Sequence, residues 1–152
     1  FGKALGCAGA AVLGSKNLID YLVQVSRTFI YDTATPPMLA AAALAATKKI
    51  QEHNSLITGL HSNILYFRKL CSAANIVLSE SSTPIQPLVL GEETRATGVA
   101  NFLLKRGIYV RAVRPPTVPV GTSRLRICIS KAHIKSDIEL LVKSLSEYLS
   151  NG

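Results

Sequence analysis

Residues 114–126 form the most specific stretch of this chain, and they read Arg-Pro-Pro-Thr-Val-Pro-Val-Gly-Thr-Ser-Arg-Leu-Arg. The prolines fix backbone φ angles and restrict the residues before them, so this loop is predicted to follow an extended, rigid path. A rigid loop has little freedom left to lose when a ligand binds. The Arg-Leu-Arg end reads as the start of a strand, in which Arg124 and Arg126 point to the same face.

Two guanidinium groups on one face suit two-point contact with a carboxylate. The alternative is a proline-rich surface loop followed by an edge strand whose arginines are merely solvated. The residue pattern by itself weights these two interpretations about equally.

Short strands and helices alternate on both sides of this loop, which predicts a small α/β layer domain. The helix expected over 92–106 has acidic residues at its start and Gly107 just past its end. Ser136 and Glu139 fit a capping box that opens the last helix. The strands are expected over residues 76–78, 85–90, 108–113 and 125–129.

A long helix is expected before this domain, over residues 36–72. Proline is well tolerated in its first turn, and Asn75 is a plausible turn after it. Its apolar residues recur at spacings of three, four or seven, which marks one buried face; these residues are Ile50, Ile57, Leu60, Ile64, Phe67 and Cys71. Upstream, helical spacing is found over 16–26, whereas 10–13 and 29–31 read as short extended pieces.

Composition limits the class of protein. The chain has 152 residues, enough for one domain with a real core, and 48% of them are hydrophobic and 17% charged, so a globular fold is expected. The formal charge of +8 comes from dispersed Lys and Arg residues without interleaved aromatics, which argues against nucleic-acid binding. The apolar runs are too short to span a membrane. The three cysteines have no CxxC spacing and are interpreted as reduced core thiols of a cytoplasmic protein.

The chain opens with Phe-Gly-Lys-Ala-Leu-Gly, and Lys3 is a candidate Schiff-base lysine. A carbonyl cofactor condenses only with a neutral, reachable amine, and small neighbours let the cofactor ring lie against the backbone. Taken alone this signal is weak, because most lysines near glycine are simply solvated. The absence of an initiating Met in what reads as a functional loop suggests a piece of a longer polypeptide.

Residues 1–9 resemble the cofactor-lysine signature of the α-oxoamine synthases and class II aminotransferases, which are pyridoxal-phosphate enzymes of fold type I. The resemblance implies that Lys3 carries pyridoxal 5'-phosphate. The threonine that contacts the cofactor phosphate in that signature would lie before residue 1. The resemblance covers essentially the whole chain.

The loop at 114–126 resembles, within that family, the members that condense L-alanine with a pimeloyl thioester, carried by coenzyme A or an acyl carrier protein, during biotin biosynthesis. By that match Arg126 holds the amino-acid carboxylate, with Arg124 as the fallback. Thr117 contacts substrate, and Arg114 is a weaker candidate for the same region. No metal pattern is found among the histidines.

Residues 29–37 resemble the family's segment that reaches the cofactor phosphate of the partner subunit, which implies a homodimer. Thr33 is the candidate for that contact. Asp32 is left out, because an acid beside a phosphate is unfavourable.

The resemblance implies an α/β fold that is the C-terminal portion of a fold type I transferase. Residues 1–35 would be the tail of the large domain, 36–72 the long connecting helix and 73–152 the small domain. The chain by itself is expected to be inactive, because the family's acid for the pyridine nitrogen and its ring-stacking histidine precede the lysine. Two alternatives stay open: a sister enzyme of the glycine C-acetyltransferase, 5-aminolaevulinate synthase or serine palmitoyltransferase type, and a non-catalytic module that retains the fold.

Overall fold

The computed structural model describes residues 1–150 and divides into two compact units, Phe1–Asn54 and Ser55–Gly152. No helix within residues 1–150 is long and apolar enough to cross a membrane.

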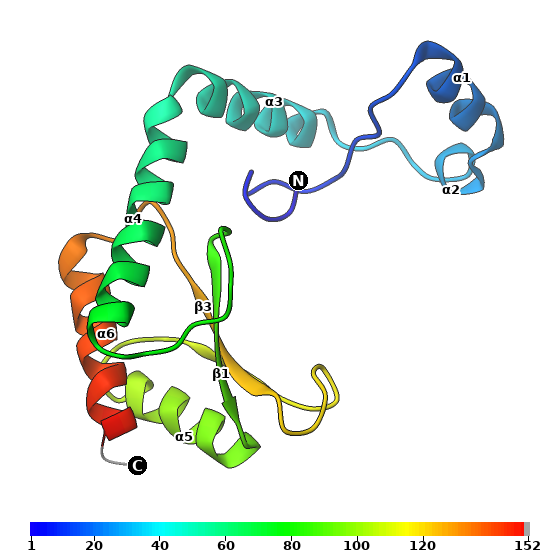
Figure 1. The fold of residues 1–152 in the computed structure, drawn as a ribbon. Coiled ribbons are helices and arrows are strands. Elements are labelled where there is room, and N and C mark those ends of the chain that lie inside the picture. Colours follow the sequence, from blue (N-terminus) through cyan, green and yellow to red (C-terminus); the bar gives the residue numbers. More distant parts are fainter. Residues whose placement is uncertain (151–152) are drawn as a thin grey trace. The chain divides into compact units, whose positions relative to one another are not determined.

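The first unit contains three helices, α1 (Lys16–Val25), α2 (Arg27–Ile30) and α3 (Pro37–Glu52) (Figure 1). Ser15 caps α1, since its side chain accepts a hydrogen bond from the Leu18 amide at 3.3 Å. α3 begins with proline in its first turn, as predicted.

Two expected strands of this unit are not present. Residues 10–13 form no strand, and within residues 1–54 no segment pairs with them to supply ladder hydrogen bonds. The piece at 29–31 lies partly in α2, where the amides of Phe29 and Ile30 donate to the Ser26 carbonyl. A short apolar run does not by itself distinguish a helix from a strand, which explains this error.

The single helix expected over 36–72 is two helices, α3 and α4 (Asn54–Ala73). His53 separates them with φ −121° and ψ 71°, which are not helical angles. The residues that follow, Asn54 and Ser55, belong to types whose side chains compete with the helical backbone and favour helix starts. The predicted apolar face is confirmed at Ile64, Phe67 and Cys71, all buried, whereas Ile57 is 43% exposed.

The second unit adds a sheet and two more helices to α4. The strands of the sheet are β1 (Ile85–Gly91), β2 (Arg111–Val113) and β3 (Ser123–Cys128), and the helices are α5 (Glu93–Leu104) and α6 (Lys135–Ser150). The strands are antiparallel in the order β1-β3-β2, so β3 is central. The small α/β domain predicted from the sequence is therefore confirmed, with a shorter β2 than expected.

One face of the sheet carries the core of this unit. Alternate residues of β3, namely Leu125 and Ile127, are buried, and α5 contacts all three strands. Tyr66 of α4 donates a hydrogen bond to Glu139 of α6, which joins those two helices (Figure 1). The opposite face of the sheet is therefore left for other contacts.

Both predicted helix stops are confirmed. Asn75 has φ +56°, its amide donates to Ser72 O and the Ile76 amide donates to Cys71 O, which is a Schellman motif. Gly107, with φ +77°, ends α5 in the same way. The segment 76–78 leaves the first of these motifs and forms no strand, which corrects the prediction made for it.

The capping pattern predicted for α6 lies two residues earlier than expected. Asp137 Oδ2 accepts a hydrogen bond from the Ile134 amide at 3.0 Å. Ile134 is therefore the N-cap residue, and Asp137, three residues later, is the acid of the capping box. The Glu139 carboxylate instead accepts a hydrogen bond from the Tyr66 hydroxyl.

The three cysteines are free, but only one is a core thiol. Cys71 is buried, Cys7 is partly buried and Cys128 is exposed. Cys128 lies at the end of β3 on the face opposite the core. The interpretation of all three as core thiols is therefore wrong for Cys7 and Cys128. For Cys128 the sequence does not tell which strand face is covered.

We expect Cys71 to resist alkylation in the native protein. Burial raises its pKa to about 12, so only about one thiol in 10⁴ is ionised at pH 8, and the thiolate is the reactive form. Iodoacetamide labelling followed by peptide mass spectrometry should modify Cys71 at least about 100-fold more slowly than Cys128. In urea the two rates should converge; equal rates in the folded protein would contradict the burial of Cys71.

Candidate active site

Arg124 and Arg126 lie on β3 with their side chains on the face opposite the core, because Ser123, Leu125 and Ile127 between and beside them are buried. The prediction that the two arginines share a face is confirmed. The strand is the central one, with β1 and β2 on either side. The alternative interpretation of an edge strand is therefore wrong.

The loop before β3 is folded into turns, and the expectation of an extended path is wrong. The Thr117 amide donates to Arg114 O at 3.0 Å, and the Pro115–Pro116 peptide bond is cis. A second turn closes where both the amide and the hydroxyl of Thr122 donate to Pro119 O. Proline fixes φ, but it also occupies turns, and the sequence pattern did not separate these outcomes.

A cavity of about 380 Å³ opens between this loop and the exposed face of the sheet. It brings together three of the residues selected from the sequence: Arg114, Thr117 and Arg126. The remaining lining residues are Arg111, Ala112, Val113 and Pro115. Arg124 does not line the cavity, and its Nε donates to Thr122 O at 2.9 Å. Arg126 is therefore better placed than Arg124 to bind a ligand there.

The cavity is positively charged. Arg114 Nη1 lies 2.6 Å from Glu93 Oε1, an exposed ion pair that neutralises this guanidinium. Neither Arg111 nor Arg126 has an acidic partner within residues 1–150. The lining contains no Asp or Glu, so two guanidinium groups remain available for an anion.

Sequence reasoning missed Arg111. It lies on β2 directly opposite Arg126 of β3 in the antiparallel register. A strand was predicted over residues 108–113, but the partner strand and the register were not. The pairing of β2 with β3 is the information that places Arg111 in the cavity.

Lys3 lies in a turn of the first unit, in which the Gly6 amide donates to Lys3 O at 2.9 Å. The residue is exposed, and Gly6 has φ +62°, a conformation that glycine adopts without strain. No ion pair engages Lys3 within the described chain. A reachable amine with small neighbours fits the requirement for holding a carbonyl cofactor.

Thr33 is also in the first unit and is exposed. Its amide donates to Asp32 Oδ1 at 2.8 Å, so the Asp32 carboxylate is engaged by the adjacent backbone. The Thr33 hydroxyl forms no hydrogen bond to other residues within 1–150 and is free to contact a ligand.

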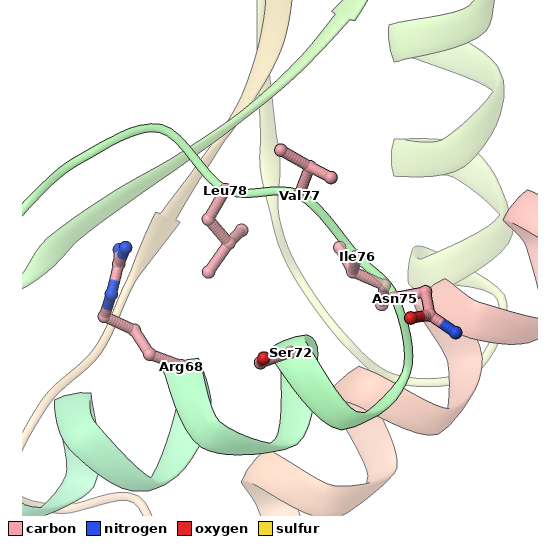
Figure 2. A pocket seen from close by; sticks show the side chains of 6 residues that line it. All are labelled: Arg68, Ser72, Asn75, Ile76, Val77 and Leu78. Atoms are coloured by element: carbon pink, nitrogen blue, oxygen red, sulfur yellow. The ribbon is translucent and has the colours of Figure 1, made fainter.

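A second surface cavity, of about 410 Å³, lies where α4 ends (Figure 2). Arg68 and Ser72 of α4 face the segment Ile76 to Leu78 across it. Arg68 Nη1 donates to Ser79 O at 3.1 Å and to the buried Gln86 Oε1 at 2.7 Å. The arginine at this cavity therefore ties the loop before β1 to α4, and its role is structural.

The family model for aminotransferase class I and II matches residues 1–145. The 8-amino-7-oxononanoate synthase of Saccharophagus degradans is 44% identical over 148 residues, which are 97% of this chain and 37% of that protein. The chain therefore spans well under half the length of this relative.

Solved structures agree with this match. The 8-amino-7-oxononanoate synthase of Francisella tularensis is 30% identical with a TM-score of 0.86, over 99% of this chain and 44% of that one. Serine palmitoyltransferase of Sphingomonas wittichii has a TM-score of 0.90 over 99% of this chain and 38% of that one. At 22% identity it shows the fold alone.

The resemblance predicted from the Lys3 segment and the 114–126 loop is confirmed, and the fold corresponds to the C-terminal part of pyridoxal-phosphate-dependent transferases. The chain belongs to the class I and II aminotransferase family.

Proposed function

We propose that this chain is part of an 8-amino-7-oxononanoate synthase, a pyridoxal-phosphate enzyme that condenses L-alanine with a pimeloyl thioester and releases carbon dioxide and the free thiol carrier. The main observation in support is that one cavity is lined by both Arg126 and Thr117, the substrate-binding residues expected from the loop resemblance. The similarity to synthases of that name supports the same assignment.

Each residue has a definite role in this proposal. Lys3 holds the cofactor, and its freed amine takes the proton from the α-carbon of alanine. Arg126 donates hydrogen bonds to the alanine carboxylate, which orients the bonds of the α-carbon. The Thr117 hydroxyl contacts the substrate from the same cavity. Arg124, on the same strand face as Arg126, stays the fallback for the carboxylate contact. Pyridoxal phosphate, when bound, supplies an electron sink for the charge left on the α-carbon.

The complete enzyme is proposed to be a cytoplasmic homodimer in which Thr33 contacts the cofactor phosphate of the partner subunit. The exposed position of Thr33 is compatible with this role. Residues 1–35 are assigned to the tail of the large domain, 36–72 to the connection and 73–152 to the small domain.

The function is tested with the complete protein that contains this chain. L-alanine with pimeloyl-CoA or pimeloyl-acyl carrier protein should yield the nine-carbon amino ketone, detected by mass spectrometry. Glycine or serine with acetyl, succinyl or palmitoyl thioesters should react at least about tenfold less efficiently. A preference for one of these other pairs would assign a sister enzyme, and no product from any pair would favour a non-catalytic module.

Replacing Arg126 with Gln should lower kcat/KM for L-alanine about 10- to 100-fold, because hydrogen bonds to a charged group contribute about 1.5–3 kcal/mol. Steady-state kinetics at varied alanine concentration measure this loss. The matched control is Arg95→Gln, an exposed arginine of α5 that does not line the cavity. Equal kinetic constants for the two variants would show that Arg126 does not bind the substrate carboxylate.

A further inference from the structure

The proposed cofactor and substrate contacts leave Arg111 without a function. Arg111 and Arg126 face each other across the β2–β3 ladder, and both line the cavity at the 114–117 loop. Like charges directly opposite in a sheet repel each other and destabilise the pairing. The sheet nevertheless carries this pair on its open face, so a ligand that relieves the repulsion is indicated.

The cavity offers positive charge for more than one anion. Arg114 is already neutralised by Glu93. The amino-acid carboxylate that the proposed function gives to Arg126 compensates one of the two remaining guanidinium groups. Arg111 then keeps an uncompensated charge in a cavity that contains no acidic side chain.

We propose that Arg111 forms a second anion subsite, which binds the carboxylate at the far end of a dicarboxylic acyl chain. This inference rests on the proposed function and deepens it, because it names the residue that selects the acyl substrate. The reaction joins the two substrates at the thioester carbonyl, and the five methylene groups of a pimeloyl chain separate that carbon from the distal carboxylate. Arg111 lies beside Arg126 and lines the same cavity, so it can receive this second carboxylate while Arg126 binds that of the amino acid. A planar guanidinium matches a carboxylate with two parallel hydrogen bonds.

Arg111→Gln in the complete protein tests the proposal. Two thioesters on the same carrier are compared, pimeloyl-CoA and heptanoyl-CoA, which have the same acyl length and differ in the distal carboxylate. The variant should lose about tenfold or more in kcat/KM for pimeloyl-CoA and less than about twofold for heptanoyl-CoA, so the preference for the dicarboxylic chain falls. The KM for alanine should stay within about twofold, and Arg95→Gln should change none of these values.

Two results would overturn the assignment. An equal loss with both thioesters would mean that Arg111 contacts the carrier or supports the fold. A raised KM for alanine with an unchanged thioester preference would mean that Arg111 shares the amino-acid carboxylate with Arg126.

A binding experiment keeps the inference separate from catalysis. Heptanedioate and heptanoate are titrated into the 152-residue chain, and the backbone amides near Arg111 and Arg126 are followed by NMR. Heptanedioate should bind several-fold more tightly, and Arg111→Gln should remove that difference. Equal affinities in the unmodified chain would overturn the second subsite, whereas failure of the condensation assay with this preference intact would reject the proposed function only.

Discussion

Replacing Lys3 with Ala in the complete protein should reduce condensation by at least about 10³-fold, the largest effect expected of any single change. The proposed role gives this amine two tasks, holding the cofactor and taking the α-proton, and general acid–base catalysis alone contributes about 10²- to 10⁴-fold. The exposed turn in which Lys3 lies makes the substitution structurally mild. Product formation from alanine and pimeloyl-CoA measures the loss.

A second readout separates lost chemistry from lost folding. Borohydride reduction of the cofactor-loaded protein should add the cofactor's mass to the peptide that carries Lys3, and Lys3→Ala should abolish that adduct. Lys48→Ala, an exposed lysine of α3 in the same unit, is the control and should keep both activity and adduct. An adduct on another lysine of the unmodified protein would reject Lys3.

The parts of the fold that could be predicted are those decided by local chemistry. The stops of α4 and α5 were found because Asn75 and Gly107 adopt left-handed conformations that few residue types tolerate. The buried face of α4 followed from helical spacing. The break at His53 was missed because the helical spacing of apolar residues continues on both sides of it. That spacing does not reveal that the backbone of His53 is not helical.

Local chemistry also decides which residues of the candidate site could be predicted from the sequence. Alternation along β3 was sufficient to put Arg124 and Arg126 on one face, and the loop resemblance selected Thr117. Neither signal carries information about strand pairing, and the partner of Arg126 is set by the register of β2, which is a tertiary property. Arg111 is therefore visible only in the structure.

Phe67→Ala should destabilise the second unit by about 3–5 kcal/mol, a large part of the usual stability of a domain. Phe67 is fully buried on α4, within the core that includes Leu88 and Leu125 of the sheet. Removal of the ring loses its buried apolar area and leaves a cavity that close-packed neighbours fill only in part. Urea denaturation followed by circular dichroism should show the loss as a lower midpoint.

Cys71 provides a local probe of the same core, since it is buried one turn further along α4. A loss of 3 kcal/mol or more raises the population of open molecules by about 100-fold or more, and the alkylation rate of Cys71 should rise accordingly. Leu65→Ala is the matched control, because Leu65 lies on the same helix and is 69% exposed. Its substitution should change the free energy of unfolding by less than about 0.5 kcal/mol. If both variants shifted the midpoint and the Cys71 rate equally, the core would not be organised around Phe67.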